Sequence, residues 1–102
     1  MSQQTFIPPA NVQRVVRWTL DYRASLPPSL RGGTIIALRR ATQLANRQPV
    51  SIDTLLRMRA WYARNARYAR EPQRSRAFVA WGLWGGAAGR AWAVSQLAQL
   101  GL

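Results

Sequence analysis

The sequence predicts an all-α protein, a compact bundle of four to five short helices that follows an extended N-terminal arm. Apolar residues recur every three or four positions through most of the chain. Proline, glycine, serine and threonine stand where these periodic segments would begin and end. No segment shows the alternating pattern of a strand. With 102 residues and a hydrophobic share of 48%, the chain suffices for one modest core. We therefore expect an arm over residues 1–10 and a single helical domain over residues 11–102.

The first helix is predicted from Asn11 to about Leu26. Pro8 and Pro9 disfavour helix in the arm, and Asn11 is a residue type that caps helix N-termini well. Two consecutive prolines at positions 27 and 28 then end the helix. Its apolar residues repeat every four positions: Val12, Val16 and Leu20.

The second and third helices each have a hydroxyl residue at the start. Thr34 can cap a helix that ends near residue 46, with an apolar side formed by Ile35, Leu38, Ala41 and Ala45. Ser51 can cap the next helix, and Asp53 complements the helix dipole in its first turn. We expect the third helix to continue to residue 70. Its inward face should comprise Leu55, Met58, Tyr62, Ala66 and Ala69.

The last third of the chain predicts one or two further helices. Ser75 can open a helix through Trp84, and Gly85-Gly86 should break or bend it, because a helix-interior glycine costs roughly 1 kcal/mol. A final helix is predicted from Ala87 to about residue 100. One of its sides carries Ala91, Val94 and Ala98.

An aromatic stripe is the most conspicuous feature of this C-terminal region. At helical spacing, Phe78, Trp81, Trp84 and Trp92 fall on one side of the predicted helix. Such a stripe is buried against the rest of the chain, against another protein as an assembly interface, or at a membrane surface. A helical protein of this size can also bury it by forming a homo-oligomer.

The net charge of +12 is the strongest compositional feature, and all fifteen basic residues are arginine. Such an excess attracts polyanions: nucleic acid, an acidic protein surface or an anionic membrane. The outer face of the third helix combines basic and aromatic residues, which suits phosphate contact and base stacking. This candidate nucleic-acid or acidic-partner face comprises Arg57, Trp61, Arg64, Arg67 and Tyr68. The alternative is a solvated basic side with Trp61 packed under a neighbouring helix.

Two further segments have a DNA- or phosphate-binding interpretation. Residues 41–58 loosely resemble a helix-turn-helix, with residues 51–59 as the recognition helix. The loop at residues 31–34, Arg-Gly-Gly-Thr, can present backbone N–H groups to a phosphate at a helix start. A tight turn is the ordinary interpretation of such a loop.

The composition argues against catalysis. The chain lacks cysteine and histidine, and it has only three acidic residues: Asp21, Asp53 and Glu71. These cannot assemble an acid/base pair or a metal site, so we expect no enzymatic activity, no metal and no cofactor. The first ten residues lack the pattern of a signal peptide, and no apolar run is long enough to span a bilayer. The chain is expected to be soluble and not exported.

Several short motifs between residues 31 and 93 resemble a small helical module of tailed-bacteriophage proteins encoded among head genes. They are R-G-G-T at residues 31–34, R-A-T-Q-L-A-N at 40–46, V-S-I-D-T-L-L-R-M at 50–58 and Y-A-R at 62–64. The longest, A-W-G-L-W-G-G-A-A-G-R-A-W-A, occupies residues 80–93. Ala87 stands where that pattern has an aspartate, and residues 65–69 replace a charged run. The resemblance implies a phage virion or head-associated protein and supplies no mechanism.

Three functional hypotheses follow from these features. The first is a small basic structural or accessory protein that attaches to the phage capsid or another virion component and contacts packaged DNA. It would be located in the virion, and in the host cytoplasm during assembly. The second is a DNA-binding protein, either nonspecific or a helix-turn-helix regulator. The third is a membrane-surface-active protein, which the even spread of arginines along the chain disfavours.

Overall fold

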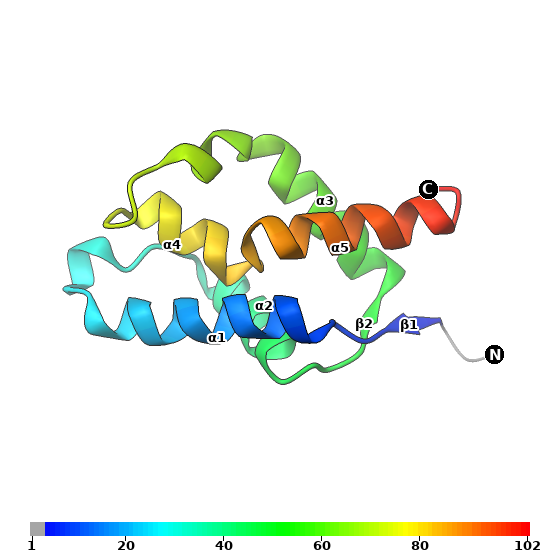
Figure 1. Ribbon diagram of the computed structural model, residues 1–102, viewed down its shortest axis with the longest axis horizontal. Coiled ribbons are helices and arrows are strands. Elements are labelled where there is room, and N and C mark those ends of the chain that lie inside the picture. The colour runs from blue at the N-terminus through cyan, green and yellow to red at the C-terminus, as the bar shows by residue number, and fades with distance from the viewer. Residues whose placement is uncertain (1–3) are drawn as a thin grey trace.

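The computed structural model describes residues 4–102 and confirms the all-α class (Figure 1). In this part of the chain the five α-helices are α1 (Ala10–Ser25), α2 (Ile35–Ala45), α3 (Ile52–Arg64), α4 (Arg76–Leu83) and α5 (Gly86–Gln99). Two 3-10 turns, η1 (Pro28–Leu30) and η2 (Ala66–Arg70), follow α1 and α3. Two very short strands, β1 (Thr5–Phe6) and β2 (Val50–Ser51), complete the elements.

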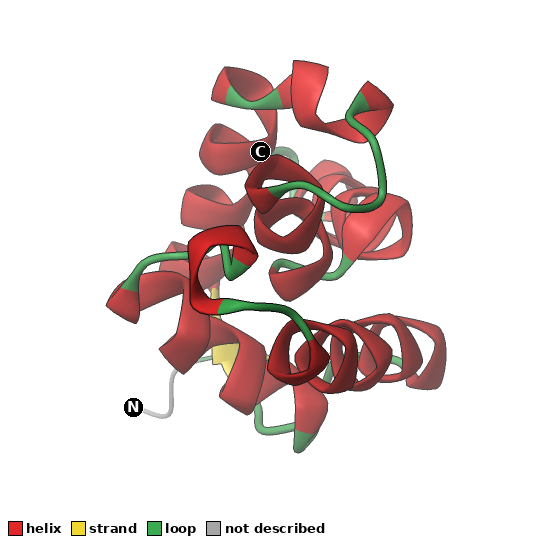
Figure 2. Ribbon diagram, turned by 90° about the vertical axis from the view of Figure 1, so that its left-hand side faces the viewer, coloured by secondary structure: helices red, strands yellow, loops and turns green. Residues whose placement is uncertain are grey.

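The molecule is elongated, with extents of 45 × 25 × 22 Å. Helix α1 packs against α2, α4 and α5, while α3 packs mainly against α5 and η2 packs against α4. Figure 1 shows β1 and the C-terminal end of α5 at the same side of the molecule, the right of the view. Viewed from the opposite end, the helices surround a common centre (Figure 2).

The core draws residues from every α-helix. Helix α3 supplies its predicted inward residues Leu55, Met58 and Tyr62, all of which are buried. The other large contributors from the helices are Val12, Val16, Leu44, Val79, Trp81, Leu83 and Leu97. Trp81 packs edge-on to Tyr62, with ring centroids 5.0 Å apart. The buried tryptophan therefore connects α4 to α3 in the centre of the protein.

Three predicted helix caps are confirmed. The hydroxyl oxygens of Thr34, Ser51 and Ser75 each accept a hydrogen bond from the backbone N–H three residues later, at 3.1, 3.2 and 3.1 Å. The predicted cap of the first helix is wrong, because α1 begins at Ala10 rather than after Asn11. Pro9 has the extended backbone of a cap residue, and its carbonyl already accepts hydrogen bonds from two following N–H groups.

The third helix is shorter than predicted, ending at Arg64 instead of residue 70. The Asn65 side chain donates to the Trp61 carbonyl at 2.9 Å, and the Asn65 backbone N–H uses the same carbonyl. Such local bonding competes with helix propagation. The following residues form the 3-10 turn η2, whose period differs from 3.6. As a result Ala66 and Ala69 are exposed, contrary to the prediction that they face inward.

Two predicted helix sides also need correction. In α2, Ile35 is 70% exposed, and the buried side is formed by Ala37, Ala41, Leu44 and Ala45. In α5, the side carrying Ala91, Val94 and Ala98 is exposed, while Gly86, Gly89, Ala93 and Leu97 are buried. Gly85 has φ 106 and Gly86 has φ 60, so α5 starts in a new direction and the side it buries does not continue that of α4.

The arm forms a strand that the sequence pattern did not predict. Thr5 pairs with Ser51 and Phe6 with Val50 in an antiparallel ladder of two residues each. Only residues 4–10 of the predicted arm are described, so residues 1–3 lie outside the structure presented here. The Arg47 Nε atom also donates to the Pro8 carbonyl at 2.8 Å. The arm is thus attached to the domain where α3 begins.

Five arginines hold the fold together by donating to backbone carbonyls. The acceptors of Arg17, Arg23, Arg31 and Arg59 are the carbonyls of Ala45, Gly32, Leu26 and Leu102, at 2.7–3.1 Å. Arg47 is the fifth. Several of these carbonyls lie at or just beyond helix C-termini, which lack intrahelical partners and favour cations. One third of the arginines therefore have structural roles.

Candidate functional site

Two adjoining hollows lie on the side of the molecule where α2 and α3 carry the lining side chains. The first hollow has a volume of about 340 Å³ and the second about 370 Å³. Thr34, Trp61 and Trp84 line both hollows, so the two adjoin each other across these residues. The first is lined by Thr34, Ile36, Arg40, Arg57, Ala60, Trp61, Arg64 and Trp84. The second extends past Tyr68 to Arg76 and Gly32-Gly33. We call the whole depression the arginine groove.

Two stacked tryptophans form the aromatic part of the arginine groove. The rings of Trp61 and Trp84 are 5.1 Å apart between centroids, with an interplanar angle of 19°. Trp84 is only 5% exposed, whereas Trp61 is half-buried, and Tyr68 packs edge-on to Trp61 at 6.0 Å. The indole Nε1 of Trp84 is buried and has no hydrogen-bond partner among the described residues.

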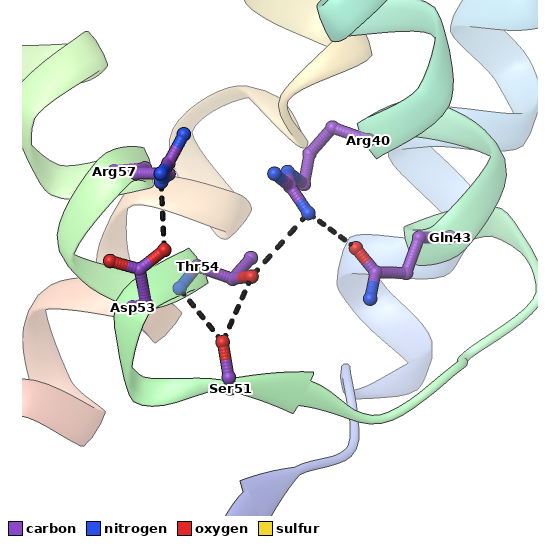
Figure 3. A network of polar contacts seen from close by, with 6 residues as sticks. All are labelled: Arg40, Gln43, Ser51, Asp53, Thr54 and Arg57. Carbon is purple, nitrogen blue, oxygen red and sulfur yellow. Dashed lines mark hydrogen bonds and ion pairs between the residues drawn. The ribbon is translucent and has the colours of Figure 1, made fainter.

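Arg40 extends from α2 toward the start of α3 (Figure 3). Its Nη1 atom donates to Gln43 Oε1 at 2.6 Å and to Thr54 Oγ1 at 3.4 Å. The Thr54 hydroxyl in turn contacts the cap hydroxyl of Ser51 at 3.2 Å. The Nε atom of Arg40 is buried and, within residues 4–102, has no acceptor. The guanidinium is therefore held in place with one buried donor, Nε, unused.

The electrostatics of the arginine groove are dominated by like charges. Arg57 forms a 2.8 Å ion pair with Asp53, the only such pair within the described residues, and both side chains are exposed. An exposed pair of this kind contributes little stability. Burial, and after it the neighbouring Arg57 guanidinium, lowers the pKa of Arg40, while Asp53 acts in the opposite direction. No acidic side chain is among the residues that line either hollow.

The structure brings four of the five residues of the predicted basic-aromatic face to this groove. Arg57, Trp61 and Arg64 line the first hollow, and Tyr68 lines the second. Arg67 is not among the lining residues; its guanidinium carbon lies 5.1 Å from the centroid of the Tyr68 ring. The expected face is therefore one wall of a groove.

The other wall includes Thr34, which caps α2, Arg40 from α2 and Arg76 from the start of α4. Of these, Thr34 belongs to the loop at residues 31–34 that the sequence offered for a phosphate, whereas Arg40 and Arg76 were not singled out. Arg40 precedes the buried Ala41 and stands four residues before the buried Leu44, at the edge of the buried side. That position could have identified Arg40 as a site residue, because neighbouring side chains restrict an arginine at the edge of the buried side of a helix.

The aromatic stripe does not form one surface. Trp81 and Trp84 are buried in the core, whereas Phe78 and Trp92 are partly buried. The Phe78 ring packs edge-on to Trp18 and Tyr22 of α1, at 6.1 and 6.0 Å. Phe78 and Trp81 lie on α4 and Trp84 caps its C-terminus, whereas the break at Gly85 places Trp92 on α5.

A separate apolar hollow lies between α1 and α4, with a volume of about 400 Å³. Trp18 stands beside it with 48% of its surface exposed and stacks on Tyr22 at 5.0 Å. The sequence pattern had not singled out Trp18. We call this depression the apolar hollow; its lining residues are Arg14, Val15, Trp18, Thr19, Phe78, Trp81, Gly82 and Gly86.

No family model, no curated protein and no solved structure matches this chain. Within residues 4–102 there is no helix of the length and apolarity needed to cross a bilayer. The same residues contain no cluster of three or more histidine, cysteine, aspartate or glutamate side chains suited to a metal ion. The two candidate sites of the described chain are thus the arginine groove and the apolar hollow.

Proposed function

We propose that this protein binds nucleic acid through the arginine groove, as a small basic structural or accessory component of a phage virion. The observation that carries the proposal is the composition of the groove. Its lining residues include four arginines, Arg40, Arg57, Arg64 and Arg76, together with the side chains of Trp61 and Trp84, and none of them is acidic. Arginine contacts phosphates, and aromatic rings stack on bases. The virion setting rests on the motif at residues 80–93 and its resemblance to head-associated phage proteins.

Free charge elsewhere on the surface supports the same proposal. Eight exposed arginines make no hydrogen bond or ion pair to other described residues: Arg14, Arg39, Arg64, Arg67, Arg70, Arg74, Arg76 and Arg90. Five of these eight fall within residues 64–76, which run from the end of α3 to the start of α4. Charge that is not neutralised internally remains available for a polyanion.

The nonspecific form of DNA binding fits this geometry better than a helix-turn-helix regulator. The connection between α2 and α3 spans residues 46–51 and includes β2, which pairs with the arm. A helix-turn-helix joins its two helices by a turn of three to four residues. In addition, α3 pairs one of its exposed arginines, Arg57, with Asp53.

The test is DNA affinity at several salt concentrations, for duplex and single-stranded DNA of unrelated sequences. We expect log affinity to fall linearly with log salt, without sequence preference, because the binding releases counterions from phosphates. Arg64→Gln should weaken binding and reduce the slope by about 0.9 for duplex DNA, the value of one lost phosphate contact. Arg39→Gln removes the same charge from an exposed position of α2 that does not line the groove, and it should have a smaller effect.

Two results would count against the proposal. Absence of binding at low salt would refute nucleic-acid binding outright. Equal losses of affinity in Arg64→Gln and Arg39→Gln would show that the total charge matters and the arginine groove does not.

A second candidate function, assembly with a capsid or other virion protein, is favoured by the apolar hollow. An exposed tryptophan beside an apolar depression is the arrangement that protein interfaces use for their central contacts. Arg14, the one arginine among the residues that line the hollow, would suit an acidic group on the partner surface. Burial of Trp81 and Trp84 means that this role would depend on Trp18 rather than on the predicted stripe.

Assembly predicts that Trp18→Ala reduces incorporation into phage particles by about tenfold or more, since truncating a central interface residue typically costs 2 kcal/mol or more. Incorporation is measured as the protein content of purified particles, with helicity checked by circular dichroism. Ile35→Ser is the matched control, because Ile35 is 70% exposed and lies outside the hollow. Particles that contain the Trp18→Ala variant in normal amount would exclude this interface.

A further inference from the structure

We propose that the hollow between α2 and α3 holds one phosphate-type oxyanion, which accepts hydrogen bonds from Arg40 Nε and from the indole N–H of Trp84. The inference rests on the proposed function for its natural ligand, a phosphodiester group of bound nucleic acid. A free phosphate ion has the same chemistry, and the experiment below separates the two.

The first step is the pair of unused donors. Arg40 Nε and Trp84 Nε1 are buried, and no described residue accepts a hydrogen bond from either. Leaving a buried donor unsatisfied costs roughly 1–3 kcal/mol, and more for a charged group. Arg40 belongs to α2 and Trp84 follows α4, and both residues line the same hollow. We infer that the acceptor which both donors lack binds in this hollow.

The second step is the charge of that acceptor. Arg57 and Arg64 line the hollow together with Arg40, and none of the other lining side chains is acidic. Burial, and after it the neighbouring Arg57 guanidinium, lowers the pKa of Arg40, so the surroundings disfavour the cationic form of Arg40. An anion between them would replace repulsion with attraction. A planar guanidinium fork suits the oxygen atoms of a phosphate particularly well.

The third step is preorganisation. The Arg40 guanidinium is held by Gln43, whose own Nε2 donates to the Pro49 carbonyl at 3.2 Å. Trp84 is fixed by its stacking on Trp61 and by the Tyr62 hydroxyl, which donates to the Trp84 carbonyl at 2.6 Å. Both donors are therefore positioned before a ligand arrives, which reduces the entropy lost on binding.

The test follows the indole N–H signals of the full chain by proton–nitrogen NMR. The chain has five tryptophans, and the Trp84 signal is identified by its loss in Trp84→Phe. If that variant does not fold, contacts to Trp61 ring protons identify the signal instead. The probes are inorganic phosphate, a short single-stranded oligonucleotide, acetate, and sodium chloride at matched ionic strength.

We expect the Trp84 signal to move saturably with phosphate and with the oligonucleotide, and to stay unmoved by chloride. Arg40→Gln should weaken the phosphate response by about tenfold, as expected when a hydrogen bond to a charged group is removed. Arg39→Gln, its neighbour on the exposed side of α2, should leave the response unchanged. An unchanged response in Arg40→Gln would overturn the proposal, and so would acetate acting as strongly as phosphate.

The outcomes separate this inference from nucleic-acid binding. If the protein binds DNA while the Trp84 signal ignores both phosphate and oligonucleotide, the oxyanion site is wrong and the proposed function stands. If phosphate moves the signal but no DNA binds at low salt, the oxyanion site stands with free phosphate as its ligand, and the proposed function fails.

Discussion

Replacing Trp84 by alanine should lower the free energy of unfolding by about 4 kcal/mol, within the range for removing a fully buried aromatic side chain. Trp84 is 5% exposed, and its ring stacks on Trp61. The truncation removes this stacking and leaves a cavity that the rigid ends of α4 and α5 cannot close. Urea denaturation followed by circular dichroism measures the loss.

Trp92→Ala is the control for this prediction. Trp92 belongs to the same sequence motif but is only partly buried on α5. Its truncation should therefore lower the free energy of unfolding by only about 1–2 kcal/mol, because the folded protein buries less of its apolar surface than that of Trp84. Equal losses in the two variants would contradict the different burial of the two rings. Because Trp84→Ala would be strongly destabilised, failure of that variant to enter particles could not be attributed to an interface.

Replacing Gly89 by alanine should destabilise the protein by about 3 kcal/mol, although alanine is normally the better helix former by about 1 kcal/mol. A Cβ atom at this position would overlap the carbonyl oxygen of Trp84 and lie 2.6 Å from the Tyr62 hydroxyl. That hydroxyl and that carbonyl form the buried hydrogen bond between α3 and the end of α4. The added methyl group must push them apart. Thermal and urea unfolding both measure the effect.

Two further variants make the Gly89 prediction specific. Ser95→Ala, at an exposed position of the same helix, should change stability by less than about 0.5 kcal/mol. In the Gly89→Ala background, Tyr62→Phe should lower the free energy of unfolding by less than it does in the parent chain, because it removes the hydroxyl that the added methyl group would meet. A Gly89→Ala protein at least as stable as the parent would show that α5 can move away from α3.

The features predicted correctly from the sequence are those set by neighbouring residues. The caps at Thr34, Ser51 and Ser75 depend on a hydroxyl and an N–H group three residues apart. The break at Gly85 depends on a backbone conformation that glycine adopts readily. The inward face of α3 depends on the helical period of 3.6 residues, which holds within one straight helix. All of these features can be predicted without knowing which distant residues pack against them.

The features that were missed depend on distant partners or on local competition. The arm becomes a strand only because β2 lies beside it, with Phe6 paired to Val50, 44 positions further along the chain. Asn65 ends α3 by bonding to Trp61, a competition that apolar periodicity does not reveal. Likewise, the arginine groove exists because α2 brings Arg40 opposite the basic face of α3, which that face alone could not indicate.

The anchoring of β1 and of the C-terminus places both at one end of the molecule. β1 pairs with β2, and the carbonyl of Leu102 accepts a hydrogen bond from Arg59, and both contacts lie at one end of the 45 Å length (Figure 1). The arginine-rich turn η2 and the start of α4 lie toward the other end. A partner that binds at β1, or a surface to which the C-terminus is attached, would hold the protein by the same end and leave its most basic segment directed away from the attachment.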